Sequence, residues 1–246
     1  MNIQVAAVIA AAGSSVRMGG IKKEFRLLPS KNKTSINECE DGEPLTVLGS
    51  AVRSFAASPR IGLIVIAIPA GAEEAARQAL TRELKKIDIR EKILFVTGGP
   101  DRRSSVYNAL NLLEKYNPCW VLIHDGARPW IKTGLIENTI DAVIQHKAVI
   151  PLLPITETPK QVDFSNSINA AGYITGHLNR NQIGIAQTPQ AFAFPEILLA
   201  HKKAAEYVET EYTDDAQIWG EFIGPVAFIR GDPENRKITF PEDLKF

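Results

Sequence analysis

The stretch Val5–Lys23, V-A-A-V-I-A-A-A-G-S-S-V-R-M-G-G-I-K-K, decides how the rest of the chain can fold. It opens with an apolar run that ends near Ala11, which predicts a strand buried on both faces inside a parallel sheet. Small residues follow from Gly13, and they let backbone N–H groups approach a ligand closely. Three cations come next: Arg17, Lys22 and Lys23. A buried strand, a small-residue loop and clustered cations together predict a polyphosphate site.

The composition is that of an ordinary globular protein. The 246 residues carry 28 Lys plus Arg and 28 Asp plus Glu, so the formal net charge is zero and nothing recommends a nucleic-acid or membrane partner. No apolar segment approaches the ~20 residues of a membrane span. Cys39 and Cys119 lack metal-site spacing, so we expect free thiols in a reducing compartment. Because the first strand begins close to Met1, we expect no signal peptide and a cytoplasmic protein.

Strand and helix patterns alternate along the chain. Expected strands cover 61–68, 93–96, 120–123, 149–153 and 226–229, with a further extended piece at 235–239; expected helices cover about 45–55, 72–84, 103–115, 134–146 and 195–207. This alternation predicts a Rossmann-like α/β fold, a mostly parallel sheet with helices on both faces. Ligands of such sheets bind beyond the carboxyl ends of the strands. The loops at Gly13, Gly98 and Asp125 all follow strands, so we expect them to face one cleft.

Two regions interrupt the alternation. Residues 29–44 are polar and aperiodic, which predicts a flexible loop. Residues 156–187 form a long mixed excursion with β-prone pieces, and a segment this long is usually functional. We therefore expect a protruding β-arm that contacts another subunit.

Two common nucleotide motifs are absent. Ser15 and Met18 occupy positions where G-x-G-x-x-G needs glycine, and no acidic residue ends the second strand, so a dinucleotide site is disfavoured. The Gly-x₄-Gly-Lys-Ser/Thr string of a P-loop does not occur either.

Six short motifs in register resemble another family. They are A-A-G-S-S-V-R-M (11–18), G-G-P-D-R-R-S-S-V (98–106), H-D-G-A-R-P (124–129), T-P-K (158–160), Q-T-P-Q (187–190) and R-K-I-T-F-P-E-D-L (236–244). Together they resemble the 2-C-methyl-D-erythritol 4-phosphate cytidylyltransferases of the non-mevalonate isoprenoid pathway. The resemblance implies one nucleotidyltransferase domain over 1–246, with Mg²⁺ as cofactor, and a reaction in which the acceptor phosphate attacks the α-phosphorus of CTP and releases pyrophosphate.

The resemblance also implies how charge is handled in such a site. Both reactants are anionic, so positioning and cations should supply most of the catalysis. Arg17, Lys23 and Lys237 match the family's catalytic cations. Each of them, taken alone, also fits an ordinary solvated surface residue. The role of Lys22 stays open, because the family commonly has proline there.

For the nucleotide, the resemblance implies a set of contacts that follow strands: Ala11, Ala12, Gly13, Ser14, Gly98, Arg102, Ser105 and Asp125. Asp125 is also the implied Mg²⁺ ligand, in keeping with how Mg²⁺ binds one carboxylate plus substrate phosphates. Ser105 is equally well read as a helix-capping hydroxyl, and Arg102 as an exposed cation at a helix start. His124 is expected to be a packed, hydrogen-bonded residue and not a ligand.

For the sugar-alcohol phosphate, the implied contacts are Arg128, Thr158, Lys160, Arg180 and Thr188. In the family, the arm residues reach the substrate of the neighbouring subunit, so the site would be shared within a homodimer. Arginine suits this task because its planar fork binds phosphate oxygens in pairs.

Three departures and two alternatives remain. Ser15 replaces a common glycine, Glu157 a common aspartate, and the segment 25–45 is longer than usual, which suggests a mobile flap over the triphosphate. One alternative is a ribitol-5-phosphate (pentitol phosphate) cytidylyltransferase, although Lys160 after Thr158-Pro159 favours methylerythritol phosphate. The other is a nucleotide-binding regulator without turnover, which the joint presence of the implied cations disfavours.

Overall fold

The computed structural model describes residues 3–13, 22–29, 44–81, 83–85, 89, 91–163, 172–207 and 209–244. The expectations for Ser14, Arg17 and nearly all of the 29–44 loop lie outside these ranges. Within them, no helix is both long and apolar enough to cross a membrane.

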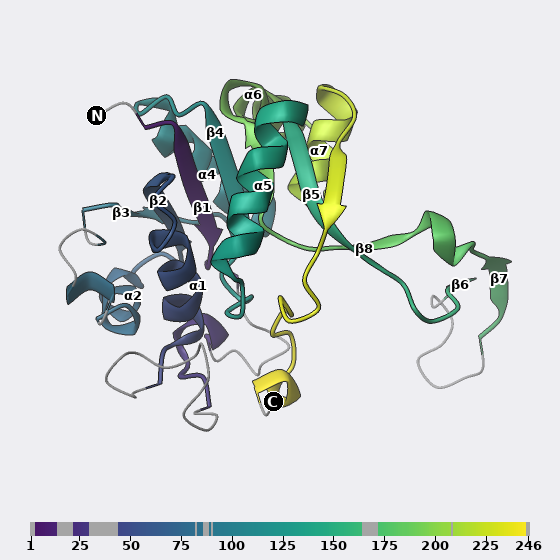
Figure 1. Cartoon of the computed structure of the whole chain (residues 1–246), viewed down its shortest axis with the longest axis horizontal. Helices are drawn as coiled ribbons and strands as arrows, with labels where there is room; N and C mark the ends of the chain where they lie inside the picture. Colours follow the sequence, from purple (N-terminus) through teal and green to yellow (C-terminus); the bar gives the residue numbers. More distant parts are fainter. Residues whose placement is uncertain are drawn as a thin grey trace.

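A twisted sheet forms the centre of the molecule (Figure 1). Its path runs β10-β5-β9-β4-β1-β2-β3, and β8 pairs with β5 beside that path. The bounds are β1 Val5–Ala10, β2 Ile61–Ile68, β3 Ile93–Thr97, β4 Trp120–Asp125, β5 Ala148–Pro154, β8 Gly184–Ala186, β9 Gln190–Ala193 and β10 Ala227–Arg230. The β1–β2, β1–β4, β2–β3 and β5–β10 pairs are parallel, whereas β9 runs antiparallel to both β4 and β5. The mostly parallel sheet predicted from the sequence is confirmed.

The central strand β1 separates two hydrophobic cores. Because strand side chains alternate between faces, Ala7 and Ile9 join one buried cluster while Ala6 and Val8 join the other. The first cluster includes residues of α1 (Val47–Ala56), α2 (Glu73–Ala79) and α5 (Thr133–His146). The second includes residues of α4 (Arg102–Glu114), α6 (Phe194–Ala204) and α7 (Asp215–Phe222). Helices therefore cover both faces, as predicted.

Several sequence-predicted elements differ from the structure. The helix expected over 72–84 ends at Ala79, because the backbone of Leu80 leaves the helical conformation and the Thr81 hydroxyl donates to the carbonyl of Gln78 at 2.8 Å. The segment 235–239 forms no strand; it crosses the end of the sheet, where the backbone N–H of Ile238 donates to the carbonyl of Ala127 at 2.8 Å. The short strand β9 and the helix α7 were not anticipated.

The arm leaves the sheet after β5 and returns at β8. Its two strands, β6 (Lys160–Val162) and β7 (Ile174–His177), pair antiparallel with each other and not with the central sheet. A short 3₁₀ turn at Arg180–Gln182 precedes β8. Figure 1 shows this hairpin extending well away from the sheet, so the predicted protruding arm is confirmed.

Candidate active site

The carboxyl ends of β1, β2 and β4 meet at one edge of the sheet. Gly98 follows β3, and its backbone N–H donates to the carbonyl of Ile68 at 2.7 Å, which draws the 98–101 loop against the end of β2. Gly126 follows β4 and donates to the carbonyl of Ala10 at 2.9 Å. The structure thus brings together the strand ends that lead into the three predicted loops, those at Gly13, Gly98 and Asp125.

A polar pocket of about 240 Å³ opens where β4 ends. Its lining is rich in charged and amide side chains from five parts of the chain: Arg102, Asp125, Arg128, Ala186, Gln187, Thr188, Gln190, Thr213, Asp214 and Lys237. Five of these were candidates from the sequence: Arg102, Asp125, Arg128, Thr188 and Lys237.

Asp125 stands at the centre of this pocket and gathers its cations. Arg102 Nε donates to Asp125 Oδ1 at 3.0 Å, and Lys237 Nζ lies 2.9 Å from Oδ2. Arg128 Nε lies 3.5 Å from Oδ2. Burial acts to raise the pKa of Asp125, but the nearby positive charges outweigh it and hold that pKa well below its usual value. The carboxylate therefore stays ionised at neutral pH.

Lys23 and Lys237 enter the site from opposite ends of the sequence. Lys23 Nζ donates to the carbonyl of Ile238 at 2.7 Å, which places its ammonium group beside the backbone of Lys237. Ile238 is fully buried and anchors this segment. Lys22 Nζ instead donates to the carbonyls of Ala12, at 3.2 Å, and of Gly13. The two neighbouring lysines thus contact different segments: Lys23 contacts the segment of Lys237, and Lys22 contacts the loop after β1.

His124 and Thr188 form a buried network beneath Asp125. The backbone N–H of Asp125 donates to Thr188 Oγ1 at 3.1 Å, which leaves the Thr188 hydroxyl to donate to His124 Nδ1 at 2.9 Å. His124 Nε2 then carries the proton and lies 3.2 Å from the carbonyl of Arg128. Burial lowers the pKa of His124 to about 4, so the ring is neutral. His124 is a packed, hydrogen-bonded residue, as expected, and the Thr188 hydroxyl is used internally.

The segment Gln187–Gln190 holds the surrounding pieces in place. The Gln187 amide accepts from the N–H of Asp232 at 3.1 Å and donates to the carbonyl of Asp232 at 2.9 Å, so it fixes the turn before Lys237. Gln190 Oε1 accepts from the N–H groups of Asp215 and Ala216 at 3.1 and 3.0 Å, so it fixes the start of α7. Sequence reasoning found this motif but gave its two glutamines no task. Both glutamines are buried, which the sequence by itself does not indicate.

The glycine loop after β3 is packed too closely for any side chain. A Cβ on Gly98 would lie 2.3 Å from the Cβ of Ala12 and 2.8 Å from Ser105 Oγ. Ser105 is buried, and its hydroxyl accepts from the N–H of Gly99 at 3.1 Å while it donates to the carbonyl of Asp101 at 2.7 Å. The N-cap of α4 is Asp101, whose carboxylate accepts from the N–H of Ser104 at 2.7 Å, so the reading of Ser105 as the helix cap is wrong.

Arg102 is also not the exposed cation that the alternative reading allowed. Its side chain retains 27% of its accessible surface and lies between two carboxylates, those of Asp125 and Asp215. Burial acts to lower the pKa of Arg102, but both carboxylates outweigh it and the net shift is upward. Asp215, which is completely buried, was missed by sequence reasoning. The Thr213-Asp214-Asp215 string before an apolar run was an available signal for a capped helix.

Arg128 ties three segments together behind the pocket. Its Nη1 donates to the carbonyl of Asn235 at 2.9 Å and its Nη2 lies 3.5 Å from the carbonyl of Ala186. Burial lowers the pKa of Arg128 despite the nearby charge of Asp125. In this structure Arg128 braces the site, and a direct contact with substrate stays a prediction.

The predicted arm residues are not brought to this pocket by their own chain. Thr158, Lys160 and Arg180 are all exposed on the arm. Arg180 Nη1 donates to the carbonyl of Thr156 at 3.0 Å, and Lys160 Nζ lies 2.9 Å from His177 Nδ1. These residues can therefore contribute to a site only where the arm contacts another molecule.

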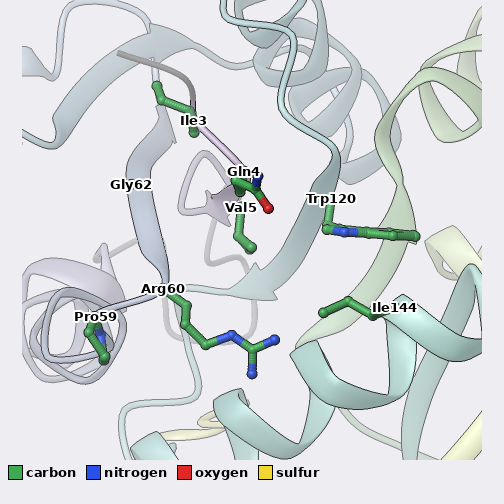
Figure 2. Close-up of a pocket in the computed structure, with 8 residues that line it drawn as sticks. All are labelled: Ile3, Gln4, Val5, Pro59, Arg60, Gly62, Trp120 and Ile144. Atoms are coloured by element: carbon green, nitrogen blue, oxygen red, sulfur yellow. The ribbon is translucent and has the colours of Figure 1, made fainter.

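A second, larger pocket of about 580 Å³ lies at the amino ends of the strands, where β1 begins at Val5 and β4 at Trp120 (Figure 2). Among the described residues that line it, Arg60 alone is charged, and it is already paired with Glu137 at 3.5 Å and with Asp141 at 2.5 Å. Nothing in this lining is suited to transfer chemistry. The smaller pocket around Asp125 is the candidate site.

The Asp125 pocket suits a cation that is bound largely by its substrate. Among the described residues there is no cluster of three or more His, Cys, Asp or Glu side chains arranged to hold a metal. Asp125 is an ionised carboxylate that faces the pocket, and its oxygens have lone pairs beyond those taken by Arg102 and Lys237. This donor set fits a hard divalent cation that keeps most of its shell for phosphates and water.

Comparisons with known proteins point in one direction. A family model described as 2-C-methyl-D-erythritol 4-phosphate cytidylyltransferase (IspD) matches residues 5–246. The bifunctional enzyme IspD/IspF of Bartonella tribocorum is 35% identical over 247 residues, covering 99% of this chain and 55% of that protein. The chain thus spans about half the length of the curated relatives it matches.

Two solved structures share the fold at moderate identity. The 4-diphosphocytidyl-2C-methyl-D-erythritol synthase of Anaerococcus prevotii is 27% identical with a TM-score of 0.77, over 98% of this chain and 93% of that one. The 2-C-methyl-D-erythritol 4-phosphate cytidylyltransferase of Francisella tularensis is 25% identical with a TM-score of 0.74, over 98% and 97%.

Proposed function

The chain belongs to the 2-C-methyl-D-erythritol 4-phosphate cytidylyltransferase family, and from this premise we propose that it joins CTP to 2-C-methyl-D-erythritol 4-phosphate. The products are 4-diphosphocytidyl-2-C-methyl-D-erythritol and pyrophosphate. The observation that carries the proposal is the gathering of Arg102 and Lys237 around the ionised Asp125, at the carboxyl ends of parallel strands.

The reaction needs little more from the protein than placement and positive charge. An oxygen of the acceptor phosphate attacks the α-phosphorus of CTP, and the bond to the pyrophosphate oxygen breaks. Negative charge builds on the transferred group as this happens, and fixed cations stabilise it. Lys237 and Lys23 are placed where the two ends of the chain meet, so we assign them this task. Arg17 is assigned with them on the family motif alone.

The cytosine is proposed to lie against the tight loop after β3. Gly98 packs directly against Ala12 because it has no side chain, and the hydroxyl of Ser105 fixes the backbone of Gly99. The backbone of Ala11 and Ala12 closes the other side, with Gly13 under the phosphates, and Ser14 is assigned to the phosphates on the family motif alone. Ser105 thereby shapes the base pocket by holding the loop, in addition to any contact of its own.

The divalent cation is assigned to Asp125, and we propose Mg²⁺. When bound, it would supply charge neutralisation across the phosphates and a fixed geometry for the α-phosphate. The residues of the chain prepare this by keeping Asp125 ionised and by holding its backbone N–H on Thr188.

The acceptor is proposed to be held by a second copy of the chain. Thr158, Lys160 and Arg180 are exposed on an arm that extends away from the sheet of its own chain, so they can serve a neighbouring cleft in a homodimer (Figure 1). Arg180 suits the acceptor phosphate, because a guanidinium binds phosphate in a bidentate manner.

The direct test is a pyrophosphate-release assay with CTP, Mg²⁺ and each candidate acceptor in turn. We expect turnover with 2-C-methyl-D-erythritol 4-phosphate and none after removal of divalent cations by a chelator. Turnover only with ribitol 5-phosphate would replace the acceptor, and CTP binding without any turnover would indicate a regulator.

A further inference from the structure

A second carboxylate lies behind Arg102 on the side away from Asp125. Asp215 is the first residue of α7, and its side chain has no accessible surface. Its Oδ2 lies 2.9 Å from Arg102 Nη1, and its Oδ1 lies 3.1 Å from Nε2 of the buried His201. Because an unpaired charge in the interior is costly, an aspartate here depends on these two neighbours.

The position of Asp215 is fixed by the fold rather than by Arg102. Gln190 of β9 accepts from the backbone N–H groups of Asp215 and Ala216. Asp214 caps the same helix, accepting from the N–H of Gln217 at 2.9 Å, and also accepts from Gln190 Nε2 at 2.8 Å. The start of α7 is therefore a rigid base from which Asp215 reaches Arg102.

Arg102 connects this base to the pocket. Its Nε donates to Asp125, which also pairs with Lys237 and Arg128, so three cations share one carboxylate. Any cation or phosphate that engages Asp125 weakens its hold on Arg102. Asp215 does not line the pocket and keeps its hold on Arg102 whatever happens at Asp125.

We propose that Asp215 is a positioning residue that retains the Arg102 guanidinium in the pocket, with its remaining donors directed at the phosphates of CTP. This rests on the proposed function, since it takes the CTP phosphates as the partner of Arg102. The pKa of Asp215 supports it: burial acts to raise this pKa, but Arg102 and His201 outweigh burial and lower it, so Asp215 stays charged. A helix-dipole role alone would not require an aspartate that faces an arginine.

The test is a double-mutant cycle on CTP affinity, measured by calorimetry. Asp215→Asn keeps the size of the side chain and removes its charge. We expect it to weaken CTP binding by about tenfold, with kcat at saturating CTP changed by less than about threefold. In an Arg102→Gln background the same change should have no further effect on CTP affinity. Asp141→Asn is the matched control, because Asp141 pairs with Arg60 by the pocket at the opposite end of the sheet and should leave CTP binding unchanged.

A measurement on the unmodified protein complements the cycle. The Arg102 Nη1–H signals in nitrogen-15 NMR should remain protected from solvent exchange when CTP and Mg²⁺ bind, because Nη1 is the nitrogen that Asp215 holds. Additive effects in the cycle, wild-type CTP affinity in Asp215→Asn, or loss of Nη1–H protection on binding would each overturn the proposal while the cytidylyltransferase assay still succeeds. Failure of the unmodified protein to bind CTP would overturn both the proposal and the proposed function.

Discussion

At the scale of single residues, charge is concentrated on one buried point. Asp125 pairs with Arg102, Arg128 and Lys237, and this arrangement gathers positive charge where we propose that the anionic substrates bind. If the proposed divalent cation binds Asp125, these side chains become available to phosphate oxygens. Such pre-placed cations lower the reorganisation that the reaction requires.

Lys237 gives the first prediction at this scale. Lys237→Gln should lower kcat by about 100-fold, because a cation near the transferred phosphate acts on the charge that develops during the reaction. The affinity for CTP should change much less, since Lys23 and Arg102 remain. Steady-state kinetics with a CTP titration measures both. Lys202→Gln is the control, because Lys202 pairs with Glu114 on the surface; equal losses in the two variants would contradict the assignment.

His124 gives a prediction about pH. Burial lowers its folded-state pKa to about 4, below the unfolded value of 6.5, so the unfolded chain binds this proton more readily. The contribution of His124 to the free energy of unfolding should therefore be fully present above pH 6.5. It should be lost as the pH falls towards 4, by up to about 3 kcal/mol.

Urea unfolding at several pH values measures this dependence. His124→Asn keeps an oxygen near the position of Nδ1 that can accept from Thr188, but it does not titrate. The free energy of unfolding of this variant should vary less between pH 6.5 and 4.5 than that of the unmodified protein. An identical slope in both proteins would show that His124 does not titrate on unfolding.

At the scale of elements, the candidate site is formed by several loops, and the short segment Gln187–Gln190 holds them in place. The predicted strands and helices around 61–68, 103–115 and 134–146 were close to the observed ones, because buried runs and helical periodicity signal them directly. β9 and α7 were missed because each is short, and β9 is recognisable only from its pairing with β4 and β5. Asp215 was missed with α7, since its role depends on a contact that local sequence does not encode.

Gly98 provides the prediction for the loops. Gly98→Ala should weaken CTP binding by tenfold or more and lower the melting temperature, because the added Cβ would lie 2.3 Å from the Cβ of Ala12. Gly134→Ala is a matched control: it lies in α5, a Cβ there meets nothing within 4 Å, and alanine favours the helix. Calorimetric CTP titrations and thermal unfolding of both variants provide the comparison. Comparable behaviour of the two would mean that the loop after β3 tolerates a side chain and does not form the base pocket.

At the scale of the whole molecule, the described chain builds one half of the proposed site. The sequence predicted both the cleft and the arm, and the three predicted arm residues do not line the cleft of their own chain. The exposed apolar side chains Ile174, Leu178 and Ile185 on the arm are in keeping with a protein contact there. Since the contact is not within the chain, the shared site is a prediction for the assembly.

Subunit complementation tests it. Arg180→Ala should impair the arm and Lys237→Gln the cleft, so each homodimer should be nearly inactive. When the two variants are unfolded together and refolded, half of the dimers should be mixed, and each mixed dimer should hold one site with an intact arm and an intact cleft. The mixture should then recover about a quarter of the unmodified activity, as random pairing of a two-fold dimer requires. Each variant unfolded and refolded by itself serves as the refolding control. Activity of the mixture that stays at the level of the separate variants would place the arm and the cleft of each site on the same chain.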